Sequence, residues 1–330
     1  MKDLDKSLAA IAIKQHSVIT LDDVIAAGGS ESSASRRCRS GHWELVYDGV
    51  YRIAGVPWTW KARVMAVVLA AGPGAVVSHL CACRLHGFGF TKAPIEITVP
   101  RGRRCFIKGV IVHTSTDLVL NADTKVDGIP VTDPDRTMLD IAKLLKPVAF
   151  GKAVEQARRS EDVDWHSLIK CLTTHARRGR PGIRKLRTLI VVNMHNDEVT
   201  DTDSELIALS LLRESGFAEP VLQHRIYDAD GILQAEMDFA WLDRLVNIEI
   251  NGEVHRQEEV IAKDDERDHY VRGLGWTVRR VWWKIPVYEP AKFIRIVRET
   301  LRSAQPVISE PGVRAEKSQA GRGGAGSGDA

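Results

Sequence analysis

The chain has 330 residues, of which 44% are hydrophobic and 27% charged, and its formal net charge is +3 at pH 7. These values are typical of a globular protein with room for two or three domains. No segment approaches the roughly 20 consecutive apolar residues that span a bilayer, and the N-terminal stretch 1–14 lacks the apolar core of a secretory signal. We therefore expect a cytoplasmic protein with no membrane partner.

The cysteines argue against a zinc site, and the arginines favour a nucleic-acid partner. The five cysteines are unevenly spaced, and Cys81-x-Cys83 is not the usual zinc spacing, so reduced, mostly buried thiols are expected. Three arginine clusters occur, within 36–39, 101–104 and 177–180. Any single cluster is most simply a solubilising surface loop, but the three together favour contact with nucleic acid.

The N-terminal region, residues 1–56, predicts three short helices followed by a hairpin. Thr20, with Asp23 three positions later, is typical of a helix start, and a second helix begins at Ser30 or Ser32 and runs to Arg39. The run 43–53 then reads as a hairpin with a turn at Asp48-Gly49. This order is that of a winged helix-turn-helix, in which the later helix enters the major groove.

The winged-helix interpretation predicts which side chains touch DNA. The expected groove and phosphate contacts, with two from the loop 101–104, are Ser33, Ser35, Arg36, Arg37, Arg39, Arg103 and Arg104. Reversing the charge of Arg36 and Arg37 should weaken binding and flatten its salt dependence. The alternative is a small helical domain that binds protein, or nothing.

Residues 57–200 are expected to form a mixed α/β middle domain. Strands are predicted at 95–100 and 109–115, and a helix after a cap at Thr132 or Asp133, with further helices at 60–71, from Ser78, at 148–159 and at 164–174. Three histidines are candidate ligands, although scattered histidines more often serve in packing: His79, His86 and His113.

Residues 201–304 are expected to form a third domain, followed by a Gly-rich disordered tail at 305–330. Its expected elements, in order, are a helix at 203–215, strands at 221–227, 232–241 and 245–251, a helix at 258–273, a strand at 276–282 and a closing helix at about 289–303. Val246 to Asn251 alternates apolar and polar residues, as a half-buried strand does. A tight hairpin turn at Asp243-Arg244 would pair 240 with 247 and Asp238 with Glu249, roughly 5 Å apart between Cβ atoms. Facing carboxylates repel each other, so the pair predicts a divalent cation, Mg²⁺ or Mn²⁺.

The sequence over about residues 203–290 resembles the Vsr-like branch of the PD-(D/E)XK nuclease superfamily, because several short motifs occur in the same order. The resemblance is carried by Glu205, "DFAW" with Asp238, "IEINGEVH" with Glu249 and His255, "DDERD" with Arg267, and "GWTVRRVWW". It implies an αβββαβ core and metal-dependent cleavage of phosphodiester bonds. Asn251 departs from the pattern, because related sequences carry Asp there and the superfamily motif carries Lys; an amide brings no charge and weakens metal affinity.

The resemblance implies a division of roles. Asp238 and Glu249 hold the metal, Glu205 or Asn251 completes its shell, His255 acts as a base towards water, and Arg267 binds a phosphate oxygen. Each of these residues also has a possible structural role without catalysis. His255 could pack in a loop, Arg267 could lie on an exposed helical face, and Glu205 could stabilise the first turn of a helix.

The sequence over about residues 15–190 resembles the AbiEi-type antitoxin family. The resemblance is carried by the predicted winged helix and by the motifs "SHLCACRLHGF" and "GIPVTDPDRTMLDIA". That family implies an autoregulating repressor that counters a nucleotidyltransferase toxin. Two main functions therefore compete: a DNA endonuclease in phage defence or mobile-element conflict, and an antitoxin repressor with a degenerate nuclease fold. An RNA-acting nuclease is a third.

Overall fold

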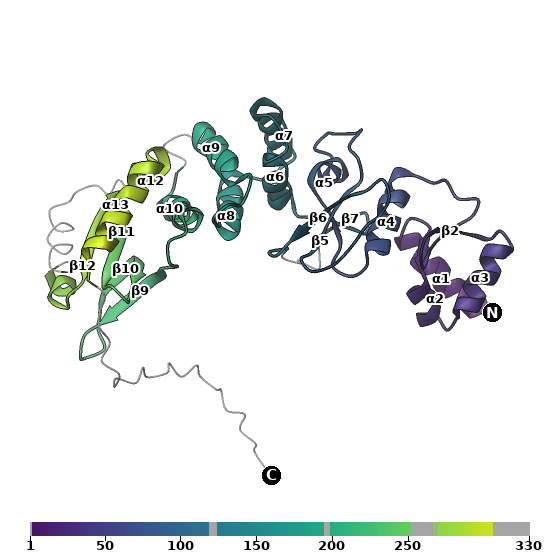
Figure 1. The fold of residues 1–330 in the computed structure, drawn as a ribbon, viewed down its shortest axis with the longest axis horizontal. Coiled ribbons are helices and arrows are strands. Elements are labelled where there is room, and N and C mark those ends of the chain that lie inside the picture. Colours follow the sequence, from purple (N-terminus) through teal and green to yellow (C-terminus); the bar gives the residue numbers. More distant parts are fainter. Residues whose placement is uncertain (1, 119–123, 195–198, 252–266, 268, 306–330) are drawn as a thin grey trace, which may run out of the picture. The chain divides into compact units, whose positions relative to one another are not determined.

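The computed structural model describes residues 2–118, 124–194, 199–251, 267 and 269–305. Helices and several small sheets alternate along the chain, so the mixed α/β class is confirmed (Figure 1). Two compact units are present. The first contains 1–219 with described parts of 250–254 and 281–294, and the second contains 220–249 with described parts of 255–280 and 295–305. The predicted base His255 and the tail from 306 lie outside the described residues.

The N-terminal elements are three helices and a three-stranded sheet of order β1-β3-β2. Their bounds are α1 Lys2–Lys14, β1 Val18–Thr20, α2 Leu21–Ala26, α3 Glu31–Arg39, β2 Trp43–Tyr47 and β3 Val50–Ile53. A small core that includes Ile19, Val24 and Ala34 holds the helices together. The predicted hairpin at 43–53 is confirmed, with Gly49 at φ +65° in its turn.

Capping explains where the two short helices begin. Thr20 and Asp23 form a reciprocal capping box at the start of α2, and Ser30 and Ser33 form another at the start of α3. Both predicted starts are confirmed, the second at Ser30 rather than Ser32. The chain needs these caps because α2 and α3 are too short to be stable alone.

A second sheet, of order β4-β5-β6, follows α4. The elements are α4 Trp60–Ala71, β4 Val76–Val77, α5 His79–His86, β5 Glu96–Pro100, β6 Ile111–Ser115, β7 Lys125–Val126 and β8 Ile129–Pro130. β4 is antiparallel and β6 parallel to β5. One apolar cluster contains residues of α4, α5 and β5 together with Val18 and Val50, so the N-terminal sheet shares a core with this layer.

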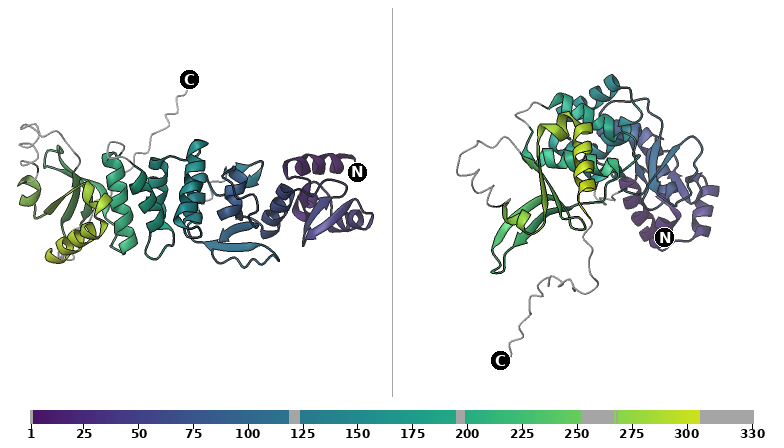
Figure 2. Two further views of the ribbon diagram at one scale, coloured as in Figure 1. Left: turned by 90° about the horizontal axis from the view of Figure 1, so that it is seen from above. Right: turned by 60° about the vertical axis from the view of Figure 1, so that its left-hand side comes forward.

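A layer of helices comes next (Figure 2). They are α6 Pro134–Ala142, α7 Pro147–Arg159, α8 Trp165–His175, α9 Ile183–Asn193 and α10 Asp201–Ser215. α8 packs on α6, α9 and α10. Asp133 caps α6, as predicted, whereas α9 was not predicted. Among the described residues, no helix is long and apolar enough to cross a membrane.

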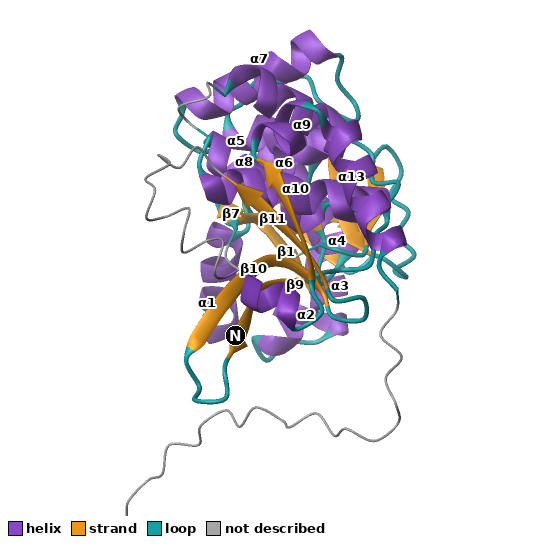
Figure 3. Cartoon of the chain, turned by 90° about the vertical axis from the view of Figure 1, so that its left-hand side faces the viewer, coloured by secondary structure: helices purple, strands orange, loops and turns teal. Residues whose placement is uncertain are grey.

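The C-terminal sheet has the order β12-β11-β10-β9 (strands in Figure 3). The elements are β9 Val221–Tyr227, β10 Leu233–Trp241, β11 Val246–Asn251, β12 Thr277–Trp282, α12 Lys284–Tyr288 and α13 Pro290–Ser303. The strands and the closing helix follow the prediction closely, but α12 was not predicted. The predicted helix at 258–273 falls largely on residues outside the described ranges; residues 269–273 are helical.

Candidate functional site

The β10–β11 hairpin determines where two carboxylates lie. Ala240 pairs with Asn247, and the neighbouring pairs have the same register. Phe239 pairs with Ile248, so the next pair along the two strands is Asp238 with Glu249. Because side chains alternate along a strand, this pair lies on the same face of the sheet as Ala240 and Asn247. The connecting turn spans 242–245, longer than the tight loop predicted, but the predicted pairing of 240 with 247 is confirmed.

Glu249 is almost fully buried, with 6% of its surface exposed, and three side chains bind its carboxylate. Arg267 donates to both oxygens, at 2.9 and 2.8 Å, and Arg280 donates at 3.2 Å. Asn247 Nδ2 donates at 3.0 Å. The carboxylate therefore has charged partners within the chain.

Opposing effects act on the ionisation of Glu249. Burial raises its pKa above the ordinary 4.5, and the two guanidinium groups lower it, while Asp238 adds a further rise. The net direction is upward, so the described cations do not fully compensate the loss of water around this carboxylate. The influence of Asp238 on Glu249 also follows from the register that sets the two carboxyl groups against each other.

Arg280 reaches Glu249 because β12 lies beside β11. The Thr277 N–H donates to the Leu245 carbonyl at 2.7 Å, and six residues further on the Trp283 N–H donates to the Asn251 carbonyl at 2.9 Å. The same offset along both strands makes them parallel and sets residue 280 next to residue 249. Arg280 was not predicted, because its position depends on a crossover between strands that local patterns do not define.

The structure describes two of the remaining candidates for the acidic site, whereas His255 lies outside the described residues. Glu205 is half-buried on α10, and Asn251 is exposed at the end of β11. Both belong to the first compact unit, whereas Asp238, Glu249 and Arg267 belong to the second. Arg267, predicted to meet a phosphate oxygen, contacts Glu249 instead in this structure.

Helix α3 presents its predicted DNA contacts in two groups. Ser35, Arg36 and Arg39 are exposed, and Ser32 joins them at helical spacing on the same face. Ser33 is occupied by the capping box, and Arg37 is bound to Asp5 at 2.6 Å and lies over the Trp43 ring. Ser32 was not predicted as a contact, although the sequence shows its i, i+3, i+4, i+7 spacing with Ser35, Arg36 and Arg39.

Some arginines of the other two clusters have partners within the chain. Arg103 and Arg104 are both exposed, and Arg103 donates to the Pro73 carbonyl. Arg177 and Arg180 both pair with Asp117. The exposed face of α3 differs from both, because two arginines and two serines lie together on one side of a helix, where they could meet an external anion.

Comparison with known proteins gives little guidance. No model of a protein family matches the chain, and no curated protein matches it. A solved structure described as the RV2827C protein from Mycobacterium tuberculosis is similar at a TM-score of 0.36 and 15% sequence identity. The similarity covers 71% of this chain and 91% of that one. A similarity this distant carries no argument about function, which has to come from the residues themselves.

Proposed function

We propose that the chain is a DNA-binding protein whose C-terminal domain carries a divalent-metal site for phosphodiester cleavage. The single observation behind the nuclease role is the hairpin register that opposes Asp238 and Glu249. Two carboxylates in this arrangement provide the oxygen ligands that Mg²⁺ or Mn²⁺ prefers. The proposed domain is of the PD-(D/E)XK type, with the sheet β12-β11-β10-β9 as its core.

DNA binding is assigned to a winged helix-turn-helix formed by α2, α3 and the β2–β3 hairpin. Its support is the element order and the exposed face of α3, where Ser32, Ser35, Arg36 and Arg39 lie together. Hydroxyl and guanidinium groups are the usual donors to phosphate oxygens and base edges. Arg104 would add a contact to the phosphate backbone.

The residues of the acidic site divide the chemical work. Asp238 and Glu249 would hold the metal, which when bound lowers the pKa of a water molecule and stabilises charge on the phosphate. Glu249 has two alternative partners: the guanidinium groups that bind it now, or the metal. If Glu249 served as a metal ligand, Arg267 could donate to a phosphate oxygen instead. His255 remains the proposed base.

Cleavage of supercoiled plasmid tests the enzyme role. The full-length protein should nick plasmid with Mg²⁺ or Mn²⁺ and not with EDTA, while Asp238→Asn and Glu249→Gln should lose the activity. Glu236→Gln is the matched control, because Glu236 lies on the same strand but pairs with Arg225. Activity retained by both site variants would show that another protein or another site cuts.

One observation favours a second function, an antitoxin-type repressor with a degenerate nuclease fold. Arg267, Arg280 and Asn247 already satisfy Glu249, and breaking those bonds costs energy that metal binding must exceed. Its partners would be its own promoter DNA and a nucleotidyltransferase-type toxin. This function predicts sequence-specific binding to the promoter region without cleavage of any DNA or RNA, and promoter binding that survives Glu249→Gln.

A further inference from the structure

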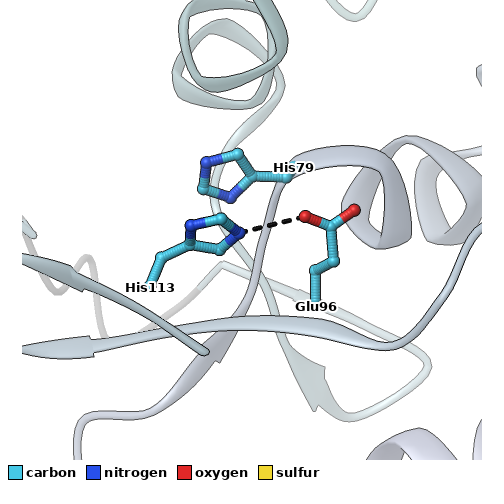
Figure 4. A group of neighbouring side chains, drawn as sticks. All are labelled: His79, Glu96 and His113. Carbon is cyan, nitrogen blue, oxygen red and sulfur yellow. Dashed lines mark hydrogen bonds and ion pairs between the residues drawn. The ribbon is translucent and has the colours of Figure 1, made fainter. Parts of the chain in front are cut away.

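Three potential metal ligands meet beside the paired strands β5 and β6 of the second sheet (Figure 4). His79 is the first residue of α5, Glu96 begins β5, and His113 lies within β6. One ligand atom from each residue, a ring nitrogen or a carboxylate oxygen, lies within 4.8 Å of the other two. Such a cluster of imidazole and carboxylate groups is independent of the Asp238–Glu249 pair, and it does not depend on the proposed nuclease function.

The sheet accounts for the meeting of residues from three elements. β5 and β6 are parallel, with Thr98 paired to His113, and Glu96 lies two positions before Thr98 on the same face. β4 is antiparallel to β5 and ends directly before Ser78, whose N–H donates to the Glu96 carbonyl at 3.1 Å. The next residue, His79, is thereby placed beside Glu96.

His79 is an unusual residue to bury. It is only 2% exposed, and its Nε2 has no hydrogen-bond partner among the described residues. Its Nδ1 lies 2.9 Å from the Ser78 hydroxyl, and its ring stacks on that of His113 at 3.7 Å between centroids. The ring nitrogen on the side of His113 and Glu96 is Nδ1 (Figure 4), which would bind a metal in place of the Ser78 hydroxyl.

The charges at the site also favour a cation. Glu96 is 3% exposed, and among the described residues its carboxylate meets His113 Nε2 at 3.0 Å. A cation bound beside this carboxylate would compensate its charge in a buried position.

We infer that His79, Glu96 and His113 bind a divalent transition-metal ion, and that Zn²⁺ is the ion that fits best. Two imidazoles and one carboxylate form a ligand set that zinc takes with a fourth position open. Mg²⁺, which prefers oxygen, is the poorer match. Ligand atoms around tetrahedral zinc are about 3.4 Å apart, so the group must contract by at most ~1.4 Å from its present spacing.

The bound metal would link α5 to the β5–β6 pair. The two strands are already joined by their hydrogen bonds, whereas α5 meets this edge through Ser78 and His79. A metal bond from His79 to ligands on both strands would fix the start of α5 on the sheet. This link would hold α5 in a layer whose core also contains Val18 and Val50 of the N-terminal sheet.

The test measures Zn²⁺ binding to the full-length protein after removal of metals with EDTA and dialysis. Titration calorimetry is carried out in excess Mg²⁺, which would occupy the Asp238–Glu249 pair and so keep Zn²⁺ from binding there. Metal analysis of the dialysed complex then gives the number of bound Zn²⁺ ions. Co²⁺ serves as a spectroscopic probe, because a tetrahedral site with nitrogen ligands gives it strong visible absorption. The variants are His113→Gln, which alters the most exposed of the three ligands, and Glu96→Gln.

His86→Gln is the matched control, since His86 lies on the same helix but bonds to the Thr132 carbonyl. We expect one Zn²⁺ per wild-type chain, unchanged by His86→Gln and weakened at least about tenfold by His113→Gln. Circular dichroism establishes that each variant is folded. Absence of stoichiometric Zn²⁺ on the wild type, or equal affinity of wild type and folded His113→Gln, would overturn the inference and leave a Glu96–His113 hydrogen bond.

Discussion

Arginines serve opposite purposes at the two candidate sites. On α3, Arg36 and Arg39 are exposed on a face shared with serines, in a helix fixed by its capping box. On the C-terminal sheet, Arg267 and Arg280 are turned onto the buried carboxylate of Glu249. The first pair is available to an external anion, and the second pair neutralises an internal one.

The difference shows that arginine content alone does not identify a nucleic-acid surface. Arg37 lies between two of the exposed α3 residues in the sequence, yet it is bound to Asp5 and stacked on Trp43. Arg177 and Arg180 likewise pair with Asp117. Each arginine has to be classified by its partner before it counts as a DNA contact.

The largest effect is expected from removing both internal guanidinium groups. Arg267→Gln with Arg280→Gln leaves Glu249 buried without a cation, which should destabilise the β11 region by about 3 kcal/mol at pH 7. This is the lower end of the usual range, because both arginines are partly exposed. Hydrogen exchange in the full-length protein, followed over 246–251, measures the loss of protection.

Arg225→Gln is the control for that double variant, because its pair with Glu236 is exposed and should contribute little. Addition of Mg²⁺ sharpens the comparison. If Asp238 and Glu249 form a metal site, Mg²⁺ should restore protection to the double variant but not when Asp238→Asn is added. Protection equal to that of the wild type without metal would contradict the view that the arginines stabilise Glu249.

A smaller effect is expected on α3. Arg36→Ala with Arg39→Ala should weaken binding to the protein's promoter DNA at least about tenfold and lower the slope of log K against log salt by about two. Arg37→Ala should change that slope by less than one, because its charge is already paired with Asp5. Fluorescence anisotropy at several salt concentrations gives both quantities. Equal slopes for the two variants would show that exposure on α3 does not determine phosphate contact.

Local features of the chain were predictable where the determining residues are close in sequence. The capping boxes at Thr20 and Ser30 each involve a residue three positions away. The register of Asp238 and Glu249 follows from a short turn and an alternating strand. Helix α9 was missed, although Ile183, Leu186 and Ile190 have helical spacing and are fully buried.

Tertiary partners were not predictable in the same way. The contact of Arg280 with Glu249 depends on a parallel crossover that joins strands 31 residues apart along the chain. The meeting of His79, Glu96 and His113 depends on the two strand pairings of the second sheet. In the sequence these histidines are scattered, and no spacing rule distinguishes them from the other histidines. Contacts of this kind are set by sheet topology, which a single sequence does not reveal.

The smallest effect concerns pH, because burial and the arginines act in opposite directions on Glu249. The folded-state pKa is raised above 4.5, so the folded protein holds this proton more tightly than the unfolded chain does. The contribution of Glu249 to stability is therefore greatest below pH 4.5 and is lost as pH rises through the folded-state value. Glu249→Gln, which cannot titrate, should remove that part of the pH dependence, whereas Glu236→Gln should leave it unchanged. Hydrogen exchange over 246–251 between pH 4 and 7, corrected for intrinsic rates, measures local stability in the wild type and in both variants. If the wild type became more stable relative to Glu249→Gln as pH rises, the guanidinium groups would outweigh burial.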